Sequence, residues 1–386
     1  MSLHEIEVPA PADFHVHLRQ GQMSELVTPH VAEGGISLGY VMPNLVPPIT
    51  SADQAAEYLA SLKKIAPNTE FLGTLYLSPA LTPAEIAKAA AAGVRGVKSY
   101  PRGVTTNSDS GIEDYETYYP IFEEMQKHNM VLNLHGEVPS NPEQGICVLN
   151  AEERFLTHLF KIHNQFPKLR IVLEHATTRK AVEAVKKCGD TVGCTITPHH
   201  LELIVDDWAG KPLNFCKPVA KYPDDREALR DVVREGHPRF FLGSDSAPHP
   251  LANKYPSAVT HGAPGVKTSS NGEDLEPTGV VACGCAAGVY TSPILVPLCA
   301  SLLEGFGALD QLANYVSLNG RRFYGYDSPE QLAKGAIKLR RTGSNSSTVP
   351  PVFVHPAFEQ TAEADPSKVQ VVPFWAGKKL AWEIAP

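Results

Sequence analysis

The stretch Asp13–Arg19 reads DFHVHLR and follows the segment Val8–Ala12. Its alternation has the period of a β-strand, in which residues i and i+2 project to the same face. His15 and His17 therefore point the same way, with their Cα atoms about 6–7 Å apart, and both can reach one metal ion. A lone H-x-H pair is equally typical of half-buried histidines, so its interpretation depends on the rest of the chain.

The composition indicates a globular protein. The chain has 386 residues, of which 43% are hydrophobic and 20% are charged, enough for one large barrel or two ordinary domains. The net charge is -8 and the basic residues are not clustered, which argues against nucleic acid as a partner. There is no basic-then-apolar leader and no apolar run of about 18 residues, so we expect a cytoplasmic protein without a membrane partner.

The seven cysteines do not suggest a disulfide framework, because an odd number in a long chain is typical of reduced, buried thiols. Cys283 and Cys285 are too close in sequence for a zinc-finger knuckle and have no matching second pair. We interpret this segment as small residues that pack tightly.

Short apolar runs alternate with helical patterns along the chain. The eight predicted strands are Asp13–Arg19, Ser37–Met42, Glu70–Leu77, Val94–Tyr100, Met130–His135, Arg170–His175, Thr191–Thr197 and Arg239–Ser244. Alternating β and α units imply a parallel sheet with right-handed crossovers, and eight such units predict an α/β fold of the (β/α)8 TIM-barrel type. A doubly wound open sheet is the alternative, although no strand is followed by a glycine-rich phosphate loop.

Helix-start signals lie between several of these strands. Ser51 is followed three residues later by Gln54, Thr82 precedes a proline and an alanine-rich run, Thr178 follows the sixth strand, and Asp224 is followed by Glu227. A polar cap with Glu or Gln three residues on is typical of a helix N-terminus.

Polar residues cluster where the predicted strands end, which is the catalytic face of a TIM barrel. They are His15, His17, Asn44, Lys98, His135, His175 and Asp245. A single histidine that closes a strand is more often a core residue than a ligand. Four histidines and one aspartate at the ends of separate strands are difficult to explain by chance.

Four imidazoles and one carboxylate suit zinc better than magnesium or calcium, which prefer oxygen ligands. The set is too large for one catalytic zinc ion and too poor in anions for two. Lys98 lies in an apolar strand, where burial lowers the pKa of an amine toward a nucleophilic form that can take up carbon dioxide. The resulting carbamate could bridge two metals; the alternative is a buried ion pair with a carboxylate.

These motifs together resemble the amidohydrolase superfamily and, within it, the dihydroorotase family of the shorter, stand-alone kind. The motifs are HVHLR at 15–19, MPN at 42–44, KSYP at 98–101, LHGE at 134–137, LEHAT at 173–177 and GSDSAPH at 243–249. The resemblance covers residues 8–340. It implies two zinc ions per chain: one is held by His15, His17 and Asp245, and the second by His135 and His175. Carboxylated Lys98 and a hydroxide would bridge them.

The reaction implied by the resemblance is the reversible conversion of N-carbamoyl-L-aspartate to L-dihydroorotate in pyrimidine synthesis. The hydroxide attacks the ring carbonyl, and Asp245 carries its proton to the leaving nitrogen. Arg19 would bind the substrate carboxylate with its planar fork, with Asn44 and His249 as further contacts. Another cyclic-amide hydrolase, such as a hydantoinase or allantoinase, is the alternative. A non-catalytic scaffold on the same fold would be expected to lack ligands.

Further expectations concern the segments outside this core. The polar residues 103–111 predict a loop in which Thr105 and Thr106 close over the substrate, as the family implies. Residues 250–278 are an insertion of unassigned role, and Ala286 after it aligns with a backbone contact to substrate. We expect one domain over residues 1–386, with a C-terminal extension from residue 341, and a homodimer by family resemblance.

Overall fold

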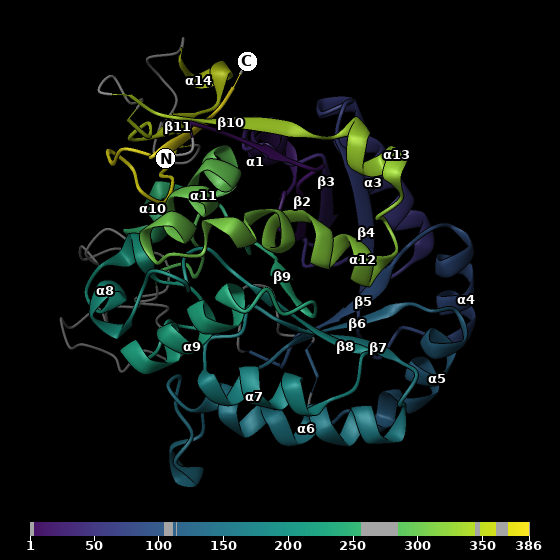
Figure 1. The fold of residues 1–386 in the computed structure, drawn as a ribbon. Helices are drawn as coiled ribbons and strands as arrows, with labels where there is room; N and C mark the ends of the chain where they lie inside the picture. The colour runs from purple at the N-terminus through teal and green to yellow at the C-terminus, as the bar shows by residue number, and fades with distance from the viewer. Residues whose placement is uncertain are drawn as a thin grey trace, which may run out of the picture.

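The computed structural model describes residues 4–103, 111–112, 114–255, 285–343, 348–359 and 370–385. Its centre is an eight-stranded parallel sheet in sequence order, surrounded by helices (Figure 1). The strands are β2 (Ala12–Val16), β3 (Leu38–Val41), β4 (Glu70–Tyr76), β5 (Gly96–Ser99), β6 (Val131–His135), β7 (Arg170–Glu174), β8 (Val192–Ile196) and β9 (Phe240–Leu242). All eight predicted strands are confirmed, as is the (β/α)8 barrel.

The sheet closes into a barrel between its first and last strands. A parallel bridge joins Val16 to Ser246, and the amide of Asp245 donates to the carbonyl of His15 at 2.8 Å. The Asp13 carboxylate accepts bonds from the amide and hydroxyl of Ser244. The seam of the barrel therefore runs directly beside the predicted ligands.

The first and last strands are shorter than expected. β2 ends at Val16 rather than at Arg19, so His17 follows the strand, and β9 ends at Leu242 rather than at Ser244. Beyond β9, Asp245 has a φ of 44°, a left-handed conformation. This turn directs the Asp245 side chain toward the barrel axis.

The helices start largely where their capping residues predict. In α3 (Ala52–Ile65), Ser51 and Gln54 form a capping box, and Thr82 and Thr178 accept bonds from the amides of Glu85 and Ala181. The cap assigned to Asp224 is wrong: α9 (Pro223–Arg234) begins earlier. Its first helical residue is Pro223, whose fixed φ suits that position, and the carboxylate of Asp225 accepts from the amide of Tyr222.

Further helices complete the molecule. They are α1 (Gly21–Val27), α2 (Pro29–Glu33), α4 (Pro83–Ala91), α5 (Tyr119–Lys127), α6 (Ala151–Gln165), α7 (Arg179–Lys187), α8 (Val205–Trp208), α10 (Leu251–Lys254), α11 (Leu295–Gly305), α12 (Asn319–Tyr324), α13 (Pro329–Lys334) and α14 (Pro356–Glu359). No helix in the described ranges is long and apolar enough to cross a membrane.

The two ends of the chain meet in a small antiparallel sheet outside the barrel (Figure 1). β10 (Ile337–Arg341) pairs with β1 (Glu5–Val8) on one side and with β13 (Trp382–Ile384) on the other. A second pair joins β11 (Phe353–Val354) to β12 (Gln370–Val371). Trp382 is fully buried, so the C-terminal segment contributes to the hydrophobic core.

The barrel interior is apolar at the N-terminal ends of the strands. Phe14 stacks on Tyr324 of α12 with ring centroids 4.6 Å apart, and Phe241 meets Phe14 edge-on at 5.6 Å. Tyr40 and Phe323 belong to the same buried cluster. These aromatic side chains fill that end of the barrel, which leaves the opposite end for the polar residues.

Candidate active site

The structure brings the predicted ligands together at the C-terminal end of the barrel. The ring centroids of His15 and His17 are 5.3 Å apart, those of His15 and His175 are 5.1 Å apart, and those of His175 and His135 are 4.7 Å apart. All four imidazoles line one cleft together with Asp245. The prediction from the alternating HVH stretch, that its two histidines share a side, is confirmed.

Asp245 is the point on which the first two imidazoles converge. Its Oδ1 lies 3.0 Å from Nε2 of His17 and 3.5 Å from Nε2 of His15. Burial alone would raise the pKa of Asp245, but the hydrogen bond to His17 and the nearby His15 and Lys98 outweigh it and hold the pKa below its usual value. The carboxylate is therefore ionised and ready to bind a cation.

Lys98 is fully buried beneath this group, and its Nζ has no hydrogen-bond partner among the described residues. The Nζ lies 5.0 Å from the centre of the Tyr100 ring. Burial lowers the pKa of Lys98 to about 8, against the attraction of Glu174 and Asp245. An unpaired buried amine is costly to keep, and a nucleophilic amine here fits a carbamate that would bridge two metal ions.

The outward nitrogens of two imidazoles are held by further side chains. His15 Nδ1 lies 2.8 Å from Glu174 Oε2, and His17 Nδ1 lies 2.8 Å from Asn44 Oδ1. With its proton on Nδ1, each ring would present the lone pair of Nε2 to a metal in place of the Nε2 contact with Asp245, which is the usual arrangement for histidine ligands. Asn44, expected as a substrate contact, therefore also orients a predicted ligand.

The second pair of imidazoles is arranged differently. His135 Nε2 lies 2.8 Å from Glu137 Oε2, so its Nδ1 is the nitrogen available to a metal. The Nδ1 of His175 is buried without a hydrogen-bond partner in the described part of the chain. Together with Lys98, these unpaired nitrogens fit a site built for metal ions.

Glu174 and Glu137 were missed as functional residues when the sequence was interpreted alone. Glu174 accepts from Asn133 at 2.7 Å and from Thr195 at 2.5 Å, besides its contact with His15. Their positions in the sequence could have indicated this role, since Glu174 directly precedes His175 and Glu137 follows His135 by two residues. Tyr100 and Lys217 also line the cleft, but only the fold shows this.

Arg19 lies at the mouth of the same cleft. Its Nε donates to the carbonyl of Pro248 at 3.0 Å, and its Nη2 lies 3.2 Å from Nε2 of His249. The hydroxyl of Tyr58 donates to the Arg19 carbonyl at 2.8 Å. The guanidinium is thus held in place, as is required of a group that orients an anion.

The backbone is left-handed at Arg19, His175 and Asp245, with φ values of 58°, 41° and 44°. Such values are uncommon for residues other than glycine, and they cluster at functional sites. Each of the three follows the end of its barrel strand and turns its side chain into the cleft.

Ala286 is not brought to the cleft wall. Its amide donates to the carbonyl of Asn253 at 2.9 Å, and its carbonyl accepts from Lys254 at 2.8 Å. Its neighbour Ala287 lines the cleft, and the contact of Ala286 with substrate stays a prediction. Thr105, Thr106 and most of the insertion at residues 250–278 lie outside the described residues.

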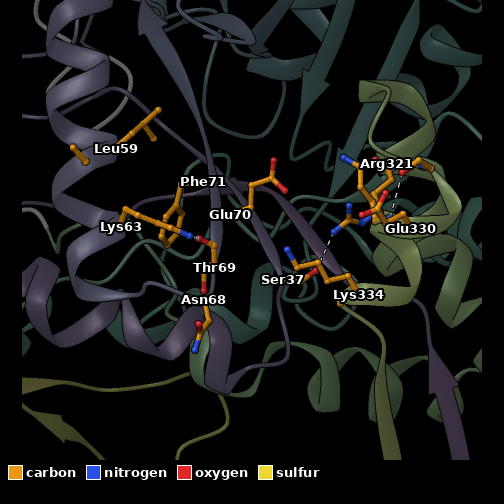
Figure 2. Close-up of a pocket in the computed structure, with 14 residues that line it drawn as sticks. Ser37, Leu59, Lys63, Asn68, Thr69, Glu70, Phe71, Arg321, Glu330 and Lys334 are labelled. Atoms are coloured by element: carbon orange, nitrogen blue, oxygen red, sulfur yellow. Dashed lines mark hydrogen bonds between the residues drawn. The ribbon is translucent and has the colours of Figure 1, made fainter.

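A larger hollow, of about 930 Å³, lies at the opposite end of the barrel between the starts of β3 and β4 and helix α13 (Figure 2). The buried guanidinium of Arg321 donates to Ser37 at 3.0 Å, and Lys63 donates to the Thr69 carbonyl at 3.3 Å, whereas the Thr69 hydroxyl has no hydrogen-bond partner among the described residues. None of the predicted ligands lines it. Its residues therefore do not converge on a reactive point.

Comparison with known proteins agrees with this geometry. Residues 6–290 match the model of the Amidohydrolase family. The chain therefore belongs to this family.

Individual relatives place the chain within the family. It is 80% identical to the dihydroorotase of Mycosarcoma maydis over 100% of this chain and 99% of that relative. It is 44% identical to the dihydroorotase of Saccharomyces cerevisiae over 98% of both chains. The chain thus belongs with the dihydroorotases, hydrolases that act on a cyclic amide.

Solved structures agree. The crystal structure of Saccharomyces cerevisiae dihydroorotase in complex with 5-fluoroorotic acid covers 99% of this chain and is itself covered to 99%, with a TM-score of 0.84 and 41% identity. An L-hydantoinase from Arthrobacter aurescens superposes with a TM-score of 0.75 at 18% identity, over 98% of this chain and 83% of its own. The second likeness shows the fold alone.

Proposed function

We propose that the chain interconverts N-carbamoyl-L-aspartate and L-dihydroorotate in pyrimidine biosynthesis, using two zinc ions per chain. The observation that carries this proposal is the buried, unpaired amine of Lys98 beneath four imidazoles and Asp245. An amidohydrolase whose cyclic substrate carries a carboxylate needs such a metal centre beside a fixed cation. Arg19 supplies that cation. The dihydroorotase relatives at 80% and 44% identity support the choice of substrate.

The residues suited to hold the metals are those whose nitrogens and oxygens converge. His15, His17 and Asp245 would hold one ion, and His135 and His175 the other. N6-carboxylated Lys98 and a hydroxide would bridge the two. When bound, the ions would polarise the ring carbonyl and supply hydroxide at neutral pH.

Lys98 acquires the bridge by a simple addition. Its neutral amine attacks carbon dioxide, a C–N bond forms, and one proton is released. The low pKa of this lysine, about 8, keeps part of the amine neutral near pH 7. The carbamate then replaces the buried amine by an anion with two oxygens. These oxygens would add anionic ligands to a site whose other ligands are mostly neutral imidazole nitrogens.

Asp245 is the proton carrier in this proposal. In the hydrolytic direction its Oδ takes the proton of the attacking hydroxide and delivers it to the ring nitrogen as the amide bond breaks. Its backbone is fixed at the barrel seam, where its amide donates to the His15 carbonyl. In the synthetic direction the same carboxylate takes the proton from the carbamoyl nitrogen.

Arg19 and His249 would bind the substrate carboxylate. Because Nε of Arg19 already donates to Pro248, the terminal nitrogens of the fork are the ones that can meet an anion. A planar guanidinium binds a carboxylate with two parallel hydrogen bonds, which a lysine cannot do. Asn44 and the backbone of residues 286–287 would contribute further contacts, and Thr105 and Thr106 would close over the acid.

A cytoplasmic homodimer is the assembly that the family resemblance favours. A hydantoinase or allantoinase activity remains the alternative, because hydantoinases share the fold. The fixed Arg19 favours an acidic substrate over a neutral hydantoin.

Two measurements on the purified protein test the proposal. It should hydrolyse dihydroorotate much faster than hydantoin. Elemental analysis should find at least two zinc ions per chain. A preference for hydantoin would reject the substrate, whereas one ion or fewer after metal-replete growth would reject the binuclear centre.

A further inference from the structure

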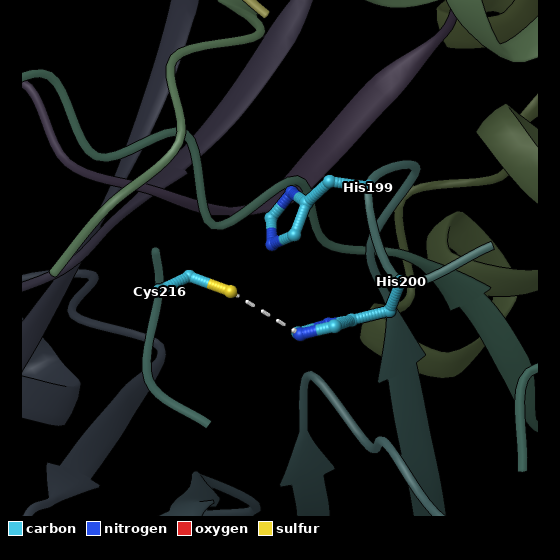
Figure 3. A group of neighbouring side chains, drawn as sticks. All are labelled: His199, His200 and Cys216. Atoms are coloured by element: carbon cyan, nitrogen blue, oxygen red, sulfur yellow. Dashed lines mark hydrogen bonds between the residues drawn. The ribbon is translucent and has the colours of Figure 1, made fainter. Parts of the chain in front are cut away.

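A second cluster of metal-binding side chains lies outside the proposed catalytic centre. His199 and His200 follow β8, and Cys216 comes from the segment that precedes α9 (Figure 3). All three residues are buried, and their donor atoms lie within 4.8 Å of one another. The cluster shares no residue with the ligands assigned above.

His199 is the unusual member of this cluster. It is 0% exposed, and neither ring nitrogen has a hydrogen-bond partner among the described residues. Burial lowers the pKa of His199 to about 3, so the ring is neutral. A buried polar group without a hydrogen-bond partner destabilises the fold, so two unpaired nitrogens on one ring are unfavourable unless a ligand binds them.

His200 and Cys216 have the spacing of neighbouring metal ligands. Cys216 Sγ lies 3.5 Å from His200 Nε2. Tetrahedral coordination with bonds of about 2.0–2.3 Å places neighbouring donors roughly 3.3–3.8 Å apart. Figure 3 shows the thiol and this imidazole nitrogen facing each other, with the His199 ring beside them.

The surroundings also suit a bound ion. Cys216 Sγ and His200 Nε2 both donate to the Pro218 carbonyl, at 3.3 and 3.0 Å, so a metal would take the place of these two protons and face the same oxygen. His200 Nδ1 lies 2.8 Å from Thr197 Oγ1. This hydroxyl can accept from Nδ1 and leave Nε2 free for the metal, as is usual for histidine ligands.

We propose that His199, His200 and Cys216 bind one borderline-soft divalent ion, zinc in particular, at a site additional to the binuclear centre. Two imidazoles and a thiolate favour zinc over magnesium or calcium. On binding, the Cys216 thiol loses its proton to solvent and a metal–sulfur bond forms. Burial raises the pKa of the Cys216 thiol to about 12, so the metal itself must displace this proton. The nearby ammonium of Lys254, which donates to the carbonyls of Phe215, Ala286 and Gly288, offsets part of the shift.

The ion would join two segments that form part of the cleft. The turn after β8 carries His199 and His200, while Cys216 directly precedes Lys217, which lines the catalytic cleft. A metal bound to both segments would fix this wall. The site rests on its own geometry and stands whether or not the proposed substrate is correct.

Cobalt(II) substitution can test the site, because only a thiolate ligand gives an intense sulfur-to-cobalt charge-transfer band in the near ultraviolet. The binuclear centre, as proposed, contains no sulfur. We expect the metal-depleted full-length protein to develop this band on titration with cobalt(II) alone. Cys216→Ser should lose the band and bind one ion fewer per chain, with an unchanged far-ultraviolet circular dichroism spectrum.

Cys285→Ser is the matched control. Its thiol lies in the same region and bonds to the Pro212 carbonyl rather than to the cluster, so the band should persist. His199→Gln should weaken cobalt binding by about 10–100-fold; His163→Gln, which alters another ring with an unpaired nitrogen, should not.

The proposal is overturned if the parent protein shows no thiolate band at saturating cobalt, if the band survives Cys216→Ser, or if Cys285→Ser removes it. Should Cys216→Ser fail to fold, the His199→Gln titration decides the matter. An unchanged affinity in that variant would exclude His199 as a ligand.

Discussion

The two ends of the barrel differ in how their polar groups are satisfied. At the C-terminal end, Lys98 Nζ and His175 Nδ1 are buried without partners among the described residues. At the N-terminal end, the buried guanidinium of Arg321 donates to the carbonyls of Ala10 and Tyr326 and to the Ser37 hydroxyl. The larger hollow lies at this second end, where the buried charged group is paired although the Thr69 hydroxyl is not (Figure 2).

Between these two hollows, an unpaired buried amine or imidazole indicates the proposed reactive end better than the size of the hollow does. A paired charge stabilises the fold, whereas an unpaired one reserves a position for a ligand. Substitutions at both ends of the barrel test the contrast, and their expected effect on turnover decreases in the order Lys98, Asp245, Glu174 and Arg321.

The largest effect is expected for Lys98→Ala. Without the amine no carbamate can form, and both metals lose their shared anionic ligand, so most activity should disappear. Turnover of dihydroorotate and metal content should be measured together, with and without added short carboxylic acids, which should restore part of the rate. Near-normal turnover would make this lysine structural, like Arg321.

Asp245→Asn should lower kcat by about 10²–10⁴-fold, which is the usual contribution of a positioned proton carrier. The amide keeps the shape of the side chain but cannot take up the proton. Some metal should remain bound, because His15 and His17 are intact. Steady-state rates in both directions are the measurement, and a loss of less than about tenfold in each would remove Asp245 from this role.

Glu174→Gln should lower activity by about 10–100-fold, the usual cost of altering the partner of a metal ligand. The glutamine would hold His15 Nδ1 less strongly, and zinc should dissociate at lower chelator concentrations. Chelator titration followed by activity measures this effect. Glu183→Gln, the same change at an exposed residue of α7, is the control; equal chelator sensitivity in the Glu174 variant and the parent would contradict the assignment.

At the opposite end, Arg321→Ala should reduce stability and leave kcat nearly unchanged. The variant removes the donor of the Tyr326 carbonyl and one of two donors of the Ala10 carbonyl, which also accepts from Ser317, so the free energy of unfolding should fall by about 2–4 kcal/mol. Lys334→Ala, an exposed side chain on the rim of the same hollow, should change it by less than about 0.5 kcal/mol. Denaturant unfolding and activity assays should be run on both. A large loss of kcat in folded Arg321→Ala would show that this end also serves catalysis.

Much of the barrel could be predicted from local sequence. Strand periodicity, alternation with helices and capping pairs such as Ser51 and Gln54 act over a few residues, and the structure contains all eight expected strands and this cap. Boundaries were less accurate where tertiary contacts end an element. β2 and β9 end at Val16 and Leu242, earlier than predicted, and α9 starts at Pro223 rather than after Asp224.

The residue types of the candidate centre were also determined by the sequence. His15, His17, Lys98, His135, His175 and Asp245 stand at strand ends, and parallel strands in a barrel end on one face. Local periodicity therefore predicted that their side chains would meet, and the structure places them around one cleft and the amine beneath it.

Only the tertiary structure decided which groups support that centre and which remain unpaired. Glu174 contacts His15, which is 159 residues away in the sequence. Cys216 contacts His200 across 16 residues that include α8, and no local pattern specifies the path of this segment. Hydrogen-bond satisfaction depends on every neighbour that the fold brings near a buried atom. Lys98 and His199 have buried nitrogens without hydrogen-bond partners among the described residues, whereas the guanidinium of Arg321 is paired. Both conditions are properties of the folded chain rather than of any segment of it.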